Sequence, residues 1–214
     1  MEKVRIRFEK TGNARFISHL DLMRTMCRAF RRAQIPMKYT EGFNPKPKMI
    51  FGNPLSLGYE SLDEVCDMEI DVSGGLEEIR ERLAAQLPAG LRPSKIYIRE
   101  SKISDISFAK YDMTITTDAF DKKAVEQLLS REDITVIKKS KSGEKEANIA
   151  PLIKESSVRE ENGNIVITAV VAFSSSASLN PDHIAKALRR YISEDFEVQY
   201  RKTATLGADG KIFI

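Results

Sequence analysis

The sequence lacks tryptophan and holds only two cysteines among 214 residues. Cys27 and Cys66 stand far apart, and neither has a second cysteine or a histidine at the spacing of a metal-ligand pair. This pattern argues against a zinc site and against an iron–sulfur cluster, so we expect no metal and no cofactor. Both cysteines fall on apolar faces of expected elements, which favours buried, reduced thiols.

Motifs of common catalytic sites are also missing. The chain has no Gly-rich phosphate loop, no HExxH, no nucleophile elbow and no Ser/His/Asp set. It has no apolar run of the roughly 18–20 residues that a membrane span needs, and its first ten residues lack the apolar core of a signal peptide. We therefore expect a cytoplasmic protein without membrane contact, and a binding protein more than an enzyme.

The charge that is present is unevenly spread. The net charge is +3, but residues 1–58 hold twelve Lys and Arg against four acids, which leaves the rest of the chain at −5. Such asymmetry indicates a local site for a polyanion. Hydrophobic residues make up 42% of the chain, so a normal core is feasible.

Hydrophobic periodicity predicts an α+β protein. Residues 1–101 read as strand, helix, two strands, helix, strand, which suits a ferredoxin-like domain with an antiparallel sheet. In that topology the first and third strands are neighbours. The outward Lys3, Arg5 and Arg7 would then lie beside the outward Asp67, Glu69 and Asp71 and be neutralised by them. The open sheet face is thus a poor candidate for a nucleic-acid surface.

A second ferredoxin-like domain is expected over residues 107–214, with one extra strand. Strands are predicted near 111–117, 134–137, 148–159, 164–173 and 196–201, and helices over 119–131 and from 181 to about 193. Residues 138–146 are charged and predict a mobile loop.

The basic character concentrates on the first helix, expected from the Ser18 N-cap to about Gln34. Its core face would hold Leu22, Met23, Met26, Cys27, Phe30 and Ala33. Four arginines fall within an arc of about 100° on the other side: Arg24, Arg28, Arg31 and Arg32. A solvated helix face usually mixes charge signs at i,i+4 spacing, whereas Asp21 is the only acid here. Phosphate binding accounts for this ridge, while a solvated face and contacts with acids of the second domain stay open.

The loop that follows combines rigid, aromatic and basic residues. Gly42 permits close approach of a ligand, and Pro45 and Pro47 stiffen the chain. Tyr39 and Phe43 could stack on bases, with Asn44 beside them, while Lys38, Lys46 and Lys48 hold phosphates. For Phe43 a place in the core is an equal alternative, and Phe51 is expected in the core.

His19 begins the first turn of the helix, with Arg15 close by in sequence. A helix N-terminus is a ready anion site. His19 could contact a phosphate or act as general acid and base in RNA cleavage, or it could be an ordinary surface histidine.

The segments ARFISHLDL (14–22), RAFRRA (28–33), GFNP (42–45), Pro47-Lys48, Pro54-Leu55 and Gly58 resemble a bacterial family of unassigned function, the radical-SAM-linked (radical-SAM-associated) family. Members of that family occur alone or fused to radical SAM proteins, and their genes often lie near those of a ribonuclease and of ribosomal proteins. The resemblance implies a radical SAM partner and an RNA setting. This chain has no CxxxCxxC, so it resembles the accessory part.

We therefore expect an RNA-binding accessory protein that acts with a radical SAM enzyme in RNA or ribosome-related metabolism. One alternative is a metal-independent endoribonuclease that uses His19, with Tyr39 or Lys48 stabilising charge. Another is a protein-interaction module without RNA binding.

Overall fold

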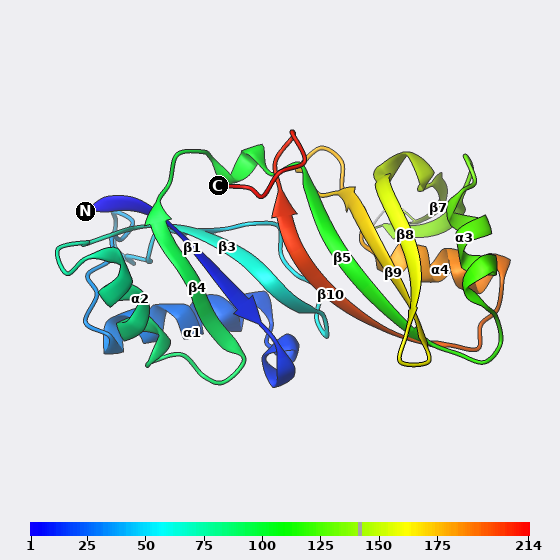
Figure 1. Ribbon diagram of the computed structural model, residues 1–214. Coiled ribbons are helices and arrows are strands. Elements are labelled where there is room, and N and C mark those ends of the chain that lie inside the picture. The colour runs from blue at the N-terminus through cyan, green and yellow to red at the C-terminus, as the bar shows by residue number, and fades with distance from the viewer. Residues whose placement is uncertain (141–142) are drawn as a thin grey trace. The chain divides into compact units, whose positions relative to one another are not determined.

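The computed structural model describes residues 1–140 and 143–214, which form an α+β protein (Figure 1). The chain divides into two compact units, residues 1–106 with 212–214, and residues 107–211. The last three residues thus belong to the first unit. That 1–101 and 107–214 are separate domains stays a prediction.

The first unit is an antiparallel sheet with helices on one face (Figure 1). Strand β1 lies between β4 and β3, and the short β2 pairs with β3. The elements are β1 (Glu2–Lys10), η1 (Gly12–Phe16), α1 (His19–Arg32), β2 (Met49–Phe51), β3 (Glu60–Ile70), α2 (Leu76–Ala84), β4 (Leu91–Ile98) and η2 (Ile103–Asp105).

Alternation along β1 builds the core of this unit, as the sequence predicts. Val4, Ile6 and Phe8 are fully buried against the helices. Helix α1 contributes Leu22, Met26, Ala29 and Phe30, and α2 contributes Ile79 and Leu83. Met23 and Cys27, expected in the core, are only half-buried because they lie at the edge of the apolar face.

The expected pairing of the first and third strands is confirmed. Arg5 lies opposite Asp67 in the register of β1 with β3, and its Nε donates to Asp67 Oδ1 at 2.8 Å. Arg7 instead pairs with Asp63 and donates to the carbonyl of Phe213. The expectation of an open sheet face is wrong at Arg5 and Arg7, which are buried, although Lys3 is exposed; the Arg5 guanidinium lies 4.2 Å from the centre of the Phe213 ring.

Within the second unit, four strands pair antiparallel in the order β10-β5-β9-β8 (Figure 1). Its elements are β5 (Phe108–Thr116), α3 (Lys122–Leu129), β6 (Thr135–Ser140), β7 (Gly143–Asn148), η3 (Ala150–Leu152), β8 (Ile153–Glu161), β9 (Asn164–Ala172), α4 (Asp182–Tyr191) and β10 (Glu197–Leu206).

Two expectations for this unit need correction. The extra strand does not join the sheet, because β6 pairs with β7 in a separate two-stranded sheet. The charged segment 138–146, expected to be a mobile loop, supplies most of this hairpin, with Lys138 opposite Lys145 and Ile137 opposite Glu146. Residues 141 and 142 of that segment lie outside the described residues.

Among the residues described, no helix is both long and apolar enough to cross a membrane.

Candidate nucleic-acid interface

The N-terminal end of α1 is capped as the sequence predicts. Ser18 Oγ accepts a hydrogen bond from the backbone N–H of Asp21 at 3.1 Å and donates to the Asp21 carboxylate at 2.7 Å. These bonds hold the pKa of Asp21 below its usual range, with Ser18 as the main cause and Arg24 next. Asp21 is therefore an anion at the start of the basic helix, and it competes with any phosphate that approaches this end.

His19 and Arg15 flank this cap. The His19 ring is exposed and meets Phe51 of β2 edge-on, with ring centres 5.3 Å apart. Arg15 lies in η1, and its guanidinium carbon is 4.8 Å from the centre of the Phe16 ring. Its Nε is buried, and no hydrogen-bond acceptor reaches it from the part of the chain that is described.

All four ridge arginines (Arg24, Arg28, Arg31 and Arg32) are exposed on α1. Among the residues that the structure describes, only Arg24 of these four forms an ion pair, with Asp21 at 3.2 Å. Arg31 donates to the hydroxyl of Tyr39 at 3.2 Å, and Arg32 donates to the backbone carbonyl of Gln86 at 2.6 Å.

No hydrogen-bond or ion-pair partner for the Arg28 side chain occurs within residues 1–140 and 143–214. The single ion pair of the ridge, Arg24 with Asp21, is more than half exposed on both sides and so contributes little stability. The ridge arginines are therefore not neutralised by described acids, and their charge is available to an anionic ligand.

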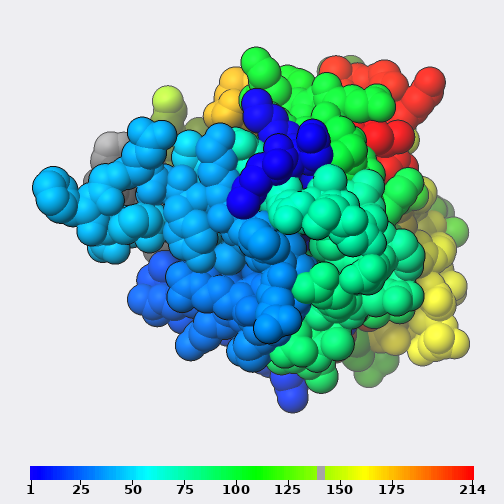
Figure 2. Space-filling view, turned by 90° about the vertical axis from the view of Figure 1, so that its left-hand side faces the viewer, coloured from blue at the N-terminus to red at the C-terminus, as the bar shows by residue number. Residues whose placement is uncertain are grey.

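The segment 37–48 is a short hairpin more than an irregular loop. Backbone bonds run from Lys38 to the carbonyl of Glu69, from Thr40 to that of Lys46, and from Lys48 to that of Lys38, at 2.8–2.9 Å. Met37 bridges to β3, and Tyr39 to Pro47. In Figure 2 this light-blue segment projects from the surface beside the darker blue of α1.

The tip of the hairpin carries Gly42 at φ 116°, a left-handed value that suits glycine. Phe43 next to it is fully exposed. Asn44 and Lys46 are exposed as well. The alternative that Phe43 fills the core is therefore wrong, whereas Phe51 packs against the core while only partly buried.

Among the described residues, Lys38 is the loop lysine that forms an ion pair, with Glu69. Lys38 Nζ lies 2.7 Å from Glu69 Oε2, and this bond is the main cause that lowers the pKa of Glu69, with Lys48 adding a smaller effect. Lys46 has no such partner among the described residues, so it is the lysine best placed to meet a phosphate.

The structure brings together part of the expected site. Arg31 contacts Tyr39, so the C-terminal end of the ridge meets the hairpin. His19 lies twelve residues before Arg31 on the same helix, about 18 Å away along the axis. His19 is thus not close to Tyr39. Lys48 lies nearer to His19 in the chain path: it precedes Phe51, which His19 contacts, by three residues, or about 10 Å of extended chain.

Sequence reasoning missed a hollow of about 400 Å³ at the C-terminal end of α1. It is lined by Arg31, Gln34, Ile35, Pro36, Met37 and Tyr39. The sequence signal was a helix end with glutamine where glycine is usual, immediately before the apolar run 35–37.

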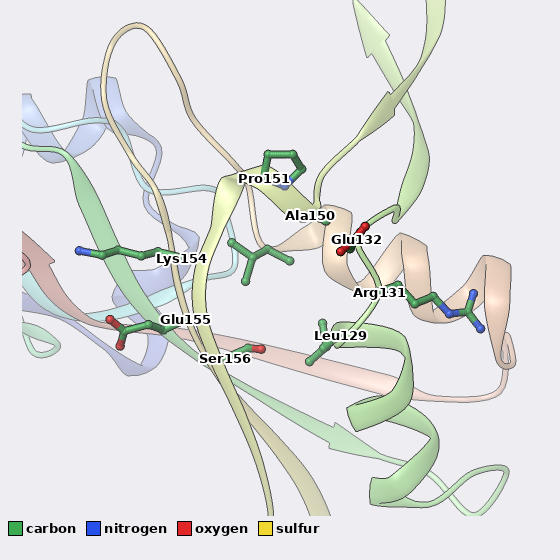
Figure 3. A pocket seen from close by; sticks show the side chains of 9 residues that line it. Leu129, Arg131, Glu132, Ala150, Pro151, Lys154, Glu155 and Ser156 are labelled. Atoms are coloured by element: carbon green, nitrogen blue, oxygen red, sulfur yellow. The ribbon is translucent and has the colours of Figure 1, made fainter.

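A second hollow, of about 430 Å³, lies in the second unit between the end of α3 and β8 (Figure 3). Its lining includes cations and anions: Arg131, Glu132, Lys154 and Glu155. The charged ends of Arg131 and Lys154 point in opposite directions (Figure 3), so this hollow does not gather charge of one sign. The described residues include no cluster of three His, Cys, Asp or Glu that could hold a metal ion.

Comparison with solved structures extends over nearly the whole chain. The structure described as "Crystal Structure of a Cbf5-Nop10-Gar1 Complex" has a TM-score of 0.52 at 10% identity and covers 94% of this chain. This chain spans 48% of that one, about half its length, and at this identity the likeness concerns the fold alone. An unknown protein from Galdieria sulphuraria is 12% identical over 94% of this chain and 98% of its own, with a TM-score of 0.28.

No curated protein matches the chain. A protein family does, over residues 3–181, which include all of the ridge and the hairpin. The chain therefore belongs to the bacterial family described as "Uncharacterized protein conserved in bacteria (DUF2344)".

Proposed function

We propose that this protein binds single-stranded RNA through α1 and the 37–48 hairpin, as an accessory protein without catalytic activity of its own. The observation that carries the proposal is the ridge of four exposed arginines, of which only Arg24 faces an acid among the described residues, next to a hairpin with an exposed aromatic tip. Phosphates supply the anions that such a ridge lacks.

The hairpin favours single-stranded RNA over a duplex or a simple anion. An exposed phenylalanine offers a face on which an unstacked base can lie, and such stacking tolerates any base. The backbone bonds of residues 38–40 with 46–48 stiffen the stem, so less freedom is lost when a ligand binds. Lys46 at the tip and Arg31 at the base would hold phosphates on either side of the stacked base.

The direct test is the fluorescence anisotropy of a labelled single-stranded RNA across a range of salt concentrations. We expect the logarithm of affinity to fall linearly with the logarithm of salt concentration. Arg28→Glu with Arg31→Glu should abolish binding at moderate salt. Lys123→Glu with Lys145→Glu, the same charge change at exposed positions of the second unit, is the control and should bind nearly as wild type does. Absence of binding at low salt, or equal binding by both double variants, refutes the proposal.

We also propose that the protein acts with a radical SAM enzyme in RNA or ribosome-related metabolism in the cytoplasm. This part rests on the family resemblance of the segments 14–22, 28–33 and 42–45. Affinity purification from cells, with and without nuclease, tests it. Recovery of a radical SAM protein that resists nuclease, from a protein that binds no RNA, would favour a pure protein-interaction module instead.

The endoribonuclease alternative has weaker support. His19 is exposed at the start of α1, where an anion could bind. However, Tyr39 contacts the other end of the helix, so it does not lie beside His19 in this conformation, and Lys48 is left as the residue that could stabilise charge. Cleavage of cellular RNA in the presence of a chelator, lost in His19→Ala, would establish the alternative; intact RNA would exclude it.

We further infer that each unit is ferredoxin-like, so that the chain holds two such domains in tandem. In its own numbering, each unit has the strand order 4-1-3-2, once the β6–β7 hairpin of the second is set aside. Helices follow the first and third of these strands in both units.

A further inference from the structure

We propose that the hollow at the C-terminal end of α1 is a subsite for one unstacked base of the RNA, an inference that rests on the proposed function. The base would stack on Tyr39, its polar edge would meet the amide of Gln34, and an adjacent phosphate would meet Arg31. These three residues all line a hollow of about 400 Å³, large enough for a base.

Gln34 occupies a position that normally takes glycine. The N–H of Ile35 donates to the carbonyl of Phe30 and the N–H of Gln34 to that of Arg31, both at 3.1 Å. These two bonds form a Schellman motif, in which the residue after the C-cap is left-handed and usually glycine. Gln34 adopts φ 54° there. A side chain kept against this conformational preference indicates a use for its amide.

The backbone around Gln34 is held from α2. The Arg82 guanidinium donates to the carbonyl of Ala33 at 2.6 Å and to that of Gln34 at 3.0 Å. Arg32 donates to the carbonyl of Gln86, which ties the same helix end to the segment after α2. The wall of the hollow is therefore fixed before any ligand arrives, as a selective site requires.

The lining matches a base in both its apolar and its polar parts. Ile35 and Met37 supply the apolar part of the lining, with 3% and 7% of their surfaces exposed. The Arg31 hydrogen bond to the Tyr39 hydroxyl sets the guanidinium at the hydroxyl end of the ring, with its carbon 5.8 Å from the ring centre.

A bare phosphate or sulfate would not need the apolar residues, and an apolar peptide would not need the amide and the guanidinium together. Base stacking on an aromatic ring beside an arginine, with an amide at the base edge, is how single-stranded RNA is read by many proteins. A glutamine amide can donate and accept at once, so it can distinguish bases by their edges.

Affinities for short single-stranded homopolymers of adenosine, uridine or cytidine test the subsite. We expect wild type to prefer one base by about 5- to 150-fold, the range of one two-bond contact. Gln34→Gly, which relaxes the left-handed position, should remove the preference while the salt dependence stays unchanged. Tyr39→Ala should weaken binding of every homopolymer by about 5- to 150-fold. Asn162→Gly, the matched change at the other left-handed non-glycine position among the described residues, should alter neither.

The outcomes separate this inference from the proposed function. If wild type binds no homopolymer, both fail. If wild type binds with a steep salt dependence but without base preference, or if Gln34→Gly keeps the full preference, the ridge binds RNA and the subsite is refuted. The subsite is equally refuted if Tyr39→Ala binds all homopolymers as wild type does, and the hollow would then be left for a protein partner.

Discussion

Arg5 and Asp67 face each other across β1 and β3 and are joined by two hydrogen bonds, from Nε at 2.8 Å and from the terminal nitrogen at 3.0 Å. Arg5 is fully buried, and the Asp67 side chain is nearly so. Arg99 adds a longer contact to the same carboxylate at 3.3 Å. The pair is thus a buried charge centre on the side of the sheet away from the helices, and its energetics differ from those of a surface ion pair.

Asp67→Asn should lower the free energy of unfolding by about 3–5 kcal/mol, because it leaves the buried guanidinium of Arg5 without its counter-charge. The midpoint of urea denaturation measures this loss. Arg92→Gln provides the control, since Arg92 pairs with Glu9 at the surface and is mostly exposed; it should cost no more than about 1 kcal/mol. Equal losses for the two variants would show that Asp67 does not carry the expected energy.

The pairing of β1 with β3 could be predicted because the element order of the first hundred residues suits a ferredoxin-like topology, in which these two strands are neighbours. The burial of Arg5 could not. Its cover comes from Ser101 and from Phe213 near the C-terminus, more than two hundred residues further along the chain. No local sequence pattern can predict a contact between residues so far apart in the chain. The alternation therefore predicted correctly which side chains share a face of the sheet, but not that this face is covered at Arg5.

The candidate site divides in the same way. Ser18 as the cap of α1, the arginine ridge and the rigid, exposed character of the hairpin follow from local sequence signals. The hollow does not, because it needs Tyr39 to return to Arg31 across eight residues and needs Arg82 to fix the helix end. The nuclease alternative combined His19 and Tyr39 because of their residue types alone. His19 lies at the start of α1, whereas Tyr39 contacts Arg31 near the end of that helix.

Gln34→Gly should stabilise the protein by roughly 1 kcal/mol, because glycine adopts positive φ without the steric cost that a side chain incurs. The expected result is a higher melting temperature with unchanged circular dichroism. Gln34→Ala keeps the steric cost and should give no comparable gain. A lower melting temperature for Gln34→Gly would mean that the glutamine side chain stabilises the fold and is not retained for a ligand.

Unfolding should depend on pH through His183 at the start of α4. Burial is the main cause that lowers the pKa of this imidazole, and Lys186 and Lys138 act in the same direction, against the carbonyl of Asn180 and the carboxylate of Asp182. The folded state therefore binds the proton less readily than the unfolded chain, whose histidine titrates near about 6.5. Stability is fully present above that pH and is lost as the pH falls toward the lower folded pKa.

His183→Gln removes this titration, so its urea midpoint should fall less than that of wild type between about pH 7.5 and pH 5.5. The carboxylates with lowered pKa, such as Asp21 and Glu69, lose their contribution only nearer pH 4 and leave this window clear. An identical decline for variant and wild type would show that His183 is not the responsible group.

Asp21 should limit how strongly the first turns of the ridge bind RNA. Its carboxylate lies 3.2 Å from Arg24, whereas Arg28, one turn further along, forms no ion pair with a described acid and acts on Asp21 only weakly. Arg28→Gln should therefore reduce the slope of log affinity against log salt by about 0.7, the value for one phosphate contact with a single strand, and Arg24→Gln should reduce it by less.

Asp21→Asn should act in the opposite direction, because it frees Arg24 for phosphate and removes a negative charge from the path of the RNA. It should raise affinity and steepen the salt dependence, and anisotropy titrations of the three variants at several salt concentrations measure both effects. Since asparagine cannot repel phosphate but still fits the first turn of the helix, lost affinity in this variant could not be blamed on charge. Lower affinity would therefore refute the prediction, and unchanged affinity and salt dependence with α1 folded would mean that the RNA does not reach this end of the ridge.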